Sequence, residues 1–132
     1  MIEENIMQLL KNDCPFDDLL FTINYAAVND NIITVYSTPG DKPSTYEGVI
    51  RDDEFQVDIK SSDFDKARAL AYYVFDKLHN LFNVTTIVQL GNNSFPVRIY
   101  LIEAKHEPAL LGTDEDEVMK YTLNFVARID KI

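Results

Sequence analysis

The segment from Glu54 to Phe82 constrains the fold more than any other part of the chain. In its first part, apolar residues alternate with polar ones in the period of a half-buried strand, at Phe55, Val57 and Ile59. After a Ser-Ser-Asp break, apolar residues recur at three- and four-residue steps over about five turns of helix. These are Phe64, Ala67, Ala71, Val74, Phe75, Leu78 and Phe82. The pattern predicts a strand followed by a long helix that packs on one face of a β-sheet.

The ends of this helix also have sequence signals. Ser62 is the predicted N-cap, and Asp65 lies in the first turn, where the helix dipole favours an acid. Asn83 is the predicted stop. The small residues Ala67 and Ala71 allow the helix to approach the sheet closely.

The rest of the chain supplies a second helix and further strands. Helical spacing of apolar residues predicts a first helix from about Ile2 to Asn12, ended by the residues before Pro15. Strands are predicted at 32–36, 95–103 and 120–129, with a further candidate at 19–23. We therefore expect an α+β fold with an antiparallel (mixed) sheet of about four strands. The long helix and the N-terminal helix pack on one face of it, in a single domain spanning residues 1–132.

The charge of the chain limits the kinds of molecule that it is suited to bind. The chain has 22 acidic and 12 basic residues in 132, a net charge of −10, and its basic residues are scattered singly. Proteins that grip nucleic acids draw most of their affinity from clustered Lys and Arg. The sequence therefore argues against specific DNA binding.

The start of the chain has no secretory pattern, since Glu3 and Glu4 occupy the place of a basic region. No apolar run approaches the roughly 20 residues that a membrane span requires. The one cysteine, Cys14, has no partner for an internal disulfide. We expect a soluble intracellular protein without a membrane association.

One pattern suggests enzymatic chemistry. Glu103-Ala104-Lys105 ends one predicted strand, and Asp58-Ile59-Lys60 lies on another. Metal-dependent nucleases hold magnesium with an Asp and a Glu-x-Lys on adjacent strands. The pattern is short and common by chance, and the alternative interpretation is two solvated strand ends.

Other candidate ligands lack partners at suitable spacing. The acidic run Asp114-Glu115-Asp116-Glu117 lacks the alternating ligands and central Gly of a calcium loop, so a solvated turn is the favoured interpretation. Neither His79 nor His106 has a second His or Cys at zinc-ligand spacing. Only four glycines are present, with no phosphate-binding loop among them. We expect no cofactor, no metal and no catalytic residues.

Three other features are candidates for contacts between proteins. The segment from Thr38 to Glu47 has turn chemistry without periodicity, and long loops of this kind often order against a partner. Asn92 and its neighbours form a second predicted loop. Tyr72 and Tyr73 lie at the edge of the helix's apolar stripe or off it. They are therefore either partly exposed or contacts to a neighbouring subunit, where Tyr is enriched.

The order of these motifs resembles a known family. The stretch from Glu54 to Lys60, a Ser/Asp turn, and then Ala67-x-x-x-Ala71-x-x-x-Phe75-Asp76-x-Leu78-His79 is similar to tail-terminator proteins of long-tailed bacteriophages. Many members of that family are labelled minor capsid or putative minor structural proteins. The stretch Pro108-x-x-Leu111-Gly112-x-Asp114-Glu115, followed by 121–125, fits the same group, as does the opening helix.

The resemblance implies a phage or prophage virion protein that forms a homo-hexameric ring. Such a ring caps the tail tube, terminates tail polymerisation and joins tail to head. It contacts the major tail-tube protein and the head completion (stopper) protein, and DNA passes through it without specific binding. The protein is made in the host bacterial cytoplasm and resides in the tail at the head–tail junction.

Subunit or partner contacts are expected on loops and exposed aromatic residues. The candidates are Pro39, Gly40, Asp41, Lys42, Pro43, Tyr46, Tyr72, Tyr73, Asn92, Asn93, Asp114, Glu115, Asp116 and Glu117. The alternatives are another head–tail connector or adaptor protein of the same architecture, and the metal-dependent nuclease described above.

Overall fold

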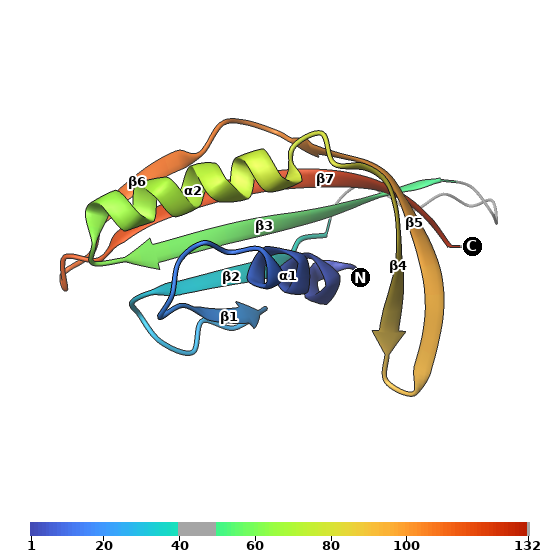
Figure 1. Ribbon diagram of the computed structural model, residues 1–132, viewed down its shortest axis with the longest axis horizontal. Helices are drawn as coiled ribbons and strands as arrows, with labels where there is room; N and C mark the ends of the chain where they lie inside the picture. Colours follow the sequence, from blue (N-terminus) through green and yellow to red (C-terminus); the bar gives the residue numbers. More distant parts are fainter. Residues whose placement is uncertain (40–49, 132) are drawn as a thin grey trace.

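A curled β-sheet with two helices on one face forms the body of the protein (Figure 1). The computed structural model describes residues 1–39 and 50–131, and within these it contains seven strands and two helices. The helices are α1 (Glu3–Asn12) and α2 (Phe64–Leu78). The strands are β1 (Leu20–Ile23), β2 (Ile32–Ser37), β3 (Arg51–Ser61), β4 (Phe82–Leu90), β5 (Asn93–Ala104), β6 (Ala109–Thr113) and β7 (Met119–Lys131).

The strand order in the sheet is β1-β2-β3-β7-β5-β4, and β6 pairs with the part of β7 that β5 does not reach. Only β1 and β2 run parallel among the described strands, so the sheet is mixed. The α+β class is confirmed, and both helices pack on one core, but α2 (Phe64–Leu78) is shorter than the predicted long helix. The predicted count of about four strands is wrong, because β4 and β6 had not been predicted.

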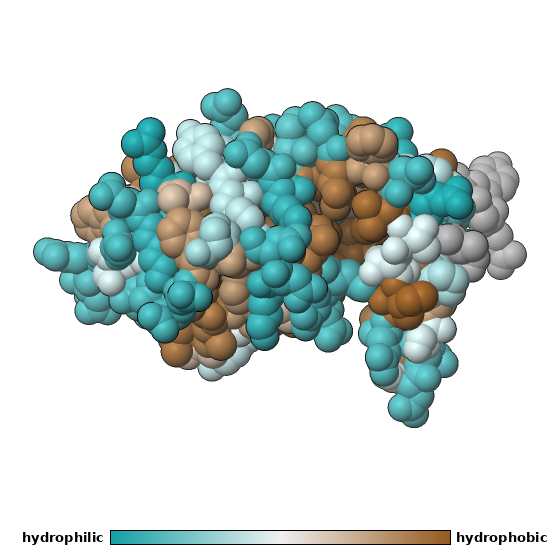
Figure 2. All heavy atoms as spheres, viewed as in Figure 1, coloured by the Kyte–Doolittle hydropathy of each residue, from teal (hydrophilic) through white to brown (hydrophobic). Residues whose placement is uncertain are grey.

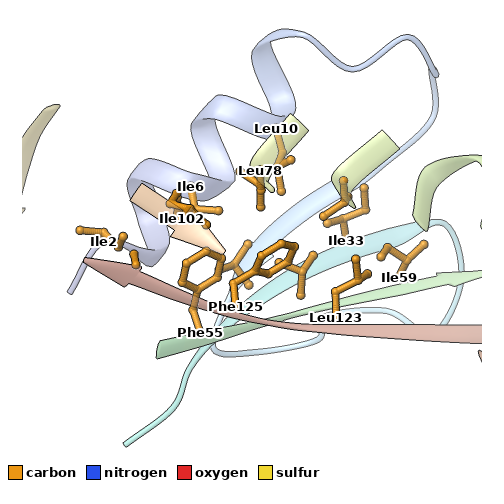
Figure 3. Packing of buried hydrophobic residues seen from close by; sticks show 14 of the residues in the cluster. Ile2, Ile6, Leu10, Ile33, Phe55, Ile59, Leu78, Ile102, Leu123 and Phe125 are labelled. Atoms are coloured by element: carbon orange, nitrogen blue, oxygen red, sulfur yellow. The ribbon is translucent and has the colours of Figure 1, made fainter. Parts of the chain in front are cut away.

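The core lies between the sheet and the two helices (Figure 3). Alternate residues of the central strands β3 and β7 point toward the helices, and Phe55 stacks on Phe125 with ring centroids 5.3 Å apart. The helices cover them with fully buried side chains: Ile6 and Leu10 from α1, and Ala67, Leu70, Ala71, Val74 and Leu78 from α2. Burial of each large apolar side chain stabilises the fold by roughly 1.5–3 kcal/mol. The period-two and helical patterns in the sequence thus describe the two halves of one core.

Helix α2 differs from its prediction at both ends. Its N-cap is Asp63, whose carboxylate accepts a hydrogen bond of 3.2 Å from the Lys66 N–H, while the Ser62 hydroxyl donates to Asp30 at 2.7 Å. The helix ends at Leu78, about one turn earlier than predicted, because Asn80 adopts a left-handed conformation (φ 65°) that reverses the chain. Phe82 therefore begins β4 and does not belong to the helix's apolar stripe.

Candidate interaction surfaces

Strands β4 and β5 form a hairpin that projects from the body of the molecule (Figure 1). Leu90 pairs with Asn93, so Gly91 and Asn92 are the two central residues of the turn. Gly91 has φ 61° at the first of these positions, where a type II′ turn requires a positive φ. The predicted loop at Asn92 and Asn93 is thus the exposed tip of a hairpin arm.

Three large apolar side chains are exposed on this hairpin. Phe82, Ile87 and Leu90 have exposed fractions of 69%, 59% and 50%. Figure 2 shows hydrophobic side chains on the arm and in the hollow beside it. Single exposed apolar residues are common, but a group of them on one projecting element is typical of a contact surface.

The arm is held against α1 by one polar side chain. The Asn5 amide donates to the Thr86 hydroxyl and to the Ile87 carbonyl oxygen, both at 2.8 Å. An open cleft of about 200 Å³ is lined by Glu4, Asn5 and Gln8 of α1 and by Ile87 and Gln89 of β4. The Asn5 contacts fix where the arm leaves the body.

The hairpin also differs from the rest of the chain in charge. Residues 78–102 contain no Asp or Glu, although one residue in six is acidic in the chain as a whole and about four would be expected. Arg98 is the one Lys or Arg in this stretch. The acid-free run is a sequence signal that could have identified the hairpin as a separate surface.

The acidic run predicted as a solvated turn is the β6–β7 turn. The Asp114 carboxylate organises it by accepting hydrogen bonds from the backbone N–H groups of Asp116 (2.9 Å) and Val118 (3.0 Å) and from the Asn29 amide (2.8 Å). The Asn29 hydrogen bond, followed by those from the backbone, lowers the pKa of Asp114. Within residues 1–39 and 50–131, no group of three His, Cys, Asp or Glu side chains is arranged to hold a metal ion. The first carboxylate of this run, that of Asp114, shapes the turn.

A second apolar surface lies beside this turn. Leu110 and Leu111 of β6 are both more than half exposed. Leu111 lines an open cleft of about 190 Å³ together with Lys60, Lys120 and Asp114. In Figure 1, β6 and the hairpin lie at opposite ends of the molecule.

The sheet face opposite the helices carries ion pairs. Asp58 is only 6% exposed, accepts hydrogen bonds of 2.8 Å from Thr122 and Gln56, and lies 3.4 Å from the Lys120 ammonium. Lys105 pairs with Glu54, and Arg128 with Asp52. In each of these ion pairs an acidic and a basic side chain lie together, so the pair adds no net charge to this face of the sheet.

The nuclease interpretation is wrong on this geometry. It required Asp58 and Glu103 on adjacent strands, but β7 lies between β3 and β5. Glu103 is level with Glu54 across β7, four residues from Asp58 along β3, which is about 13 Å at the rise of a strand. The structure does not bring the expected ligands together.

The two tyrosines have different surroundings. Tyr72 is 44% exposed on α2 and remains a candidate contact residue. Tyr73 is half-buried, and its hydroxyl donates a hydrogen bond of 2.8 Å to the Leu10 carbonyl oxygen at the end of α1. Burial, followed by the charges of Cys14 and Asp13, raises the pKa of Tyr73 to about 12. The Tyr73 hydroxyl thus joins the two helices, and the role of Tyr73 as a subunit contact stays a prediction.

The other predicted contact residues do not form one site with Tyr72 and Tyr73. Pro39 is exposed after the end of β2. The predicted contacts at Gly40, Asp41, Lys42, Pro43 and Tyr46 lie outside the described residues. Asn92 and Asn93 are at the hairpin tip, and the turn at 114–117 is at the other end of the molecule. The candidate residues therefore define separate surfaces.

Neither helix α1 nor helix α2, the two helices of residues 1–39 and 50–131, is long and apolar enough to cross a membrane.

The fold and its surfaces define a small α+β protein whose candidate functional residues lie on projecting and exposed elements. A family model described as "Bacteriophage tail terminator protein" matches residues 9–131, and the chain belongs to this family. The resemblance seen in the order of sequence motifs is thereby confirmed. The protein is a phage tail structural protein, a component of the virion that associates with other phage proteins.

A solved structure shows the same fold. A chain of the "Virion of native gene transfer agent (GTA) particle" superposes with a TM-score of 0.63 at 18% sequence identity, over 95% of this chain and 91% of that one. A search of curated proteins gave no match. The fold is therefore supported independently of the family assignment.

Proposed function

We propose that the protein forms a ring that caps the tail tube, terminates tail polymerisation and joins the tail to the head. Membership of the tail terminator family supports the general role. A terminator has to bind the end of the tube and leave no surface on which the next layer of tube can form. The function therefore depends on binding surfaces, and no catalytic step is required.

The observation that carries the ring proposal is the presence of two different apolar surfaces at opposite ends of the chain. One is the hairpin with Phe82, Ile87 and Leu90, and the other is β6 with Leu110 and Leu111. Contact between two different patches is heterologous, and it generates a closed ring when the rotation between copies closes. The resemblance to tail terminators suggests six copies.

The net charge suits the passage of DNA through such a ring. Each chain carries −10, and among its 12 basic side chains Lys105, Lys120 and Arg128 are paired with acids. A surface of the same sign as the phosphate backbone repels it and leaves DNA free to slide. We propose that DNA crosses the ring without specific binding.

Exposed candidate residues are proposed contacts to subunits or partners. They are Pro39, Tyr72, Asn92, Asn93 and the turn residues Asp114, Glu115, Asp116 and Glu117. The partners would be the major tail-tube protein on one side of the ring and a head completion protein on the other.

Electron microscopy of tail tubes assembled with the protein tests the proposal. We expect ring-shaped density at one end of each tube, with sixfold averages. Tubes whose ends carry no added density would contradict it. Binding to the head connector without binding to tube ends would identify a connector protein that acts elsewhere in the junction.

A further inference from the structure

We infer that, in the ring, the β4–β5 hairpin of one copy docks into the cleft beside β6 of the next copy. This inference rests on the ring proposed above and names the two surfaces that meet in it. It follows from charge, from shape and from the positions of the two surfaces in the molecule.

Charge favours a second copy of this chain as the occupant. The chain carries −10 and residues 78–102 carry +1, so the rest of each molecule carries −11. Two such bodies repel each other, and like charges across an interface oppose association. The hairpin up to Ile102 lies within the long stretch of the chain that has no acidic side chain, so this part meets an acidic neighbour at the least electrostatic cost.

The cleft beside β6 suits that partner. Lys60 and Lys120 line it, and the one acid in its lining, Asp114, is already bonded to Asn29 and to backbone N–H groups. Acid-free hairpin residues add no repulsion to Asp114 or to the acidic turn that follows it. The aliphatic parts of the lysine side chains provide apolar surface next to Leu111.

The two surfaces also match in size. The cleft has a volume of about 190 Å³. A cavity of ~150 Å³ accepts a benzene molecule, so this one has room for an aliphatic side chain. Ile87 and Leu90 project from the arm and are exposed in the single chain. A projecting apolar side chain filling a cleft in the partner is the usual form of an interface hot spot.

The hairpin and β6, whose Leu111 lines the cleft, lie at opposite ends of the molecule (Figure 1). One copy therefore offers its hairpin at one end and its cleft at the other. This arrangement joins copies head to tail and leaves neither surface uncovered in a closed ring.

Two substitutions test the two sides separately. Ile87→Lys places a charge on the arm, and Leu111→Lys places one in the cleft. Ala69→Lys is the matched control, because Ala69 is exposed on α2, away from both surfaces. Each change makes the net charge less negative by one, so added repulsion cannot explain a loss of assembly. Circular dichroism and thermal unfolding establish that each variant is folded.

Native mass spectrometry and sedimentation velocity, on the protein alone and with tail tubes, measure assembly. We expect wild type and Ala69→Lys to assemble. Ile87→Lys and Leu111→Lys should each associate at least about thirtyfold more weakly, as at a hot spot worth ~2 kcal/mol. An equal mixture of these two variants should form a dimer, because the intact hairpin of Leu111→Lys meets the intact cleft of Ile87→Lys.

The failures of the two proposals are distinguishable. If the wild type forms rings and both variants do so equally well, the hairpin assignment is overturned and the ring stands. If the variants fail singly and the mixture stays monomeric, the pairing of hairpin with cleft is overturned. If the wild type stays monomeric alone and on tubes, the ring itself falls, and the hairpin inference with it.

Discussion

Replacing Tyr73 by Phe tests how the two helices are held together. The substitution removes the hydroxyl that donates to the Leu10 carbonyl oxygen and keeps the ring that packs against the core. This carbonyl is among the last of α1, where helix geometry provides no N–H donor for it. A net hydrogen bond contributes about 1 kcal/mol, and a half-buried acceptor left without a donor adds little more. We therefore expect a loss of about 1 kcal/mol in the free energy of unfolding, or ~4 °C in Tm.

Urea denaturation followed by circular dichroism measures this loss. Tyr72→Phe is the matched control, because Tyr72 is exposed on the same helix and the change should fall within about 0.5 kcal/mol of wild type. Equal effects of the two substitutions would refute the reasoning, since the structure gives only Tyr73 a partner in α1.

The difference in unfolding free energy between wild type and Tyr73→Phe should also depend on pH. The pKa of Tyr73 is about 12 in the folded protein and near 10 when unfolded. A raised pKa contributes stability that is fully present below pH 10 and lost as pH rises through 12. The stability difference between wild type and Tyr73→Phe should therefore shrink between pH 10 and 12. A difference that stays constant over this range would show that the hydroxyl titrates alike in both states.

Four further substitutions test other parts of the structure. Phe125→Ala should lower the free energy of unfolding by about 3–5 kcal/mol in urea denaturation because its ring is fully buried, while Phe82→Ala, on the exposed start of β4, should change it by less than about 0.5 kcal/mol. Gly91→Ala should cost about 1 kcal/mol, measured in the same way, because φ is positive and the added methyl group meets nothing within 4 Å; a wild-type value would refute the assigned turn. Asp114→Ala should lower Tm at neutral pH. Its lowered pKa contributes stability that is present above the ordinary aspartate pKa of 3.8 and lost as pH falls below it, so the two Tm values should converge in acid.

The helices and strands whose apolar residues recur with a clear period were predictable from the sequence. Alternation at Phe55, Val57 and Ile59 gave β3, and the spacing from Phe64 to Leu78 gave α2. Strand β4 was missed because its exposed and buried residues do not alternate cleanly, since both Phe82 and Asn83 are exposed at its start. Strand β6 has only five residues and a glycine, so it has no readable period.

The candidate surfaces were predictable only in part. The turn chemistry at Asn92 and the acidic run at Asp114 identified two loops correctly, because turn residues act locally. The role of Tyr73 was not predictable, since its partner Leu10 lies 63 residues away in sequence. The acid-free stretch at 78–102 is visible in the sequence, but the structure was needed to show that most of it forms one projecting arm.

The growth of tail tubes in the presence of the protein tests the central claim most directly. Tail-tube protein polymerises with and without the purified chain, and tube lengths are measured by electron microscopy. A ring that caps the tube should stop elongation, so tubes should become shorter as more protein is added, with one ring of six 15.2 kDa copies per capped end. Tubes of unchanged length at every concentration would contradict the account.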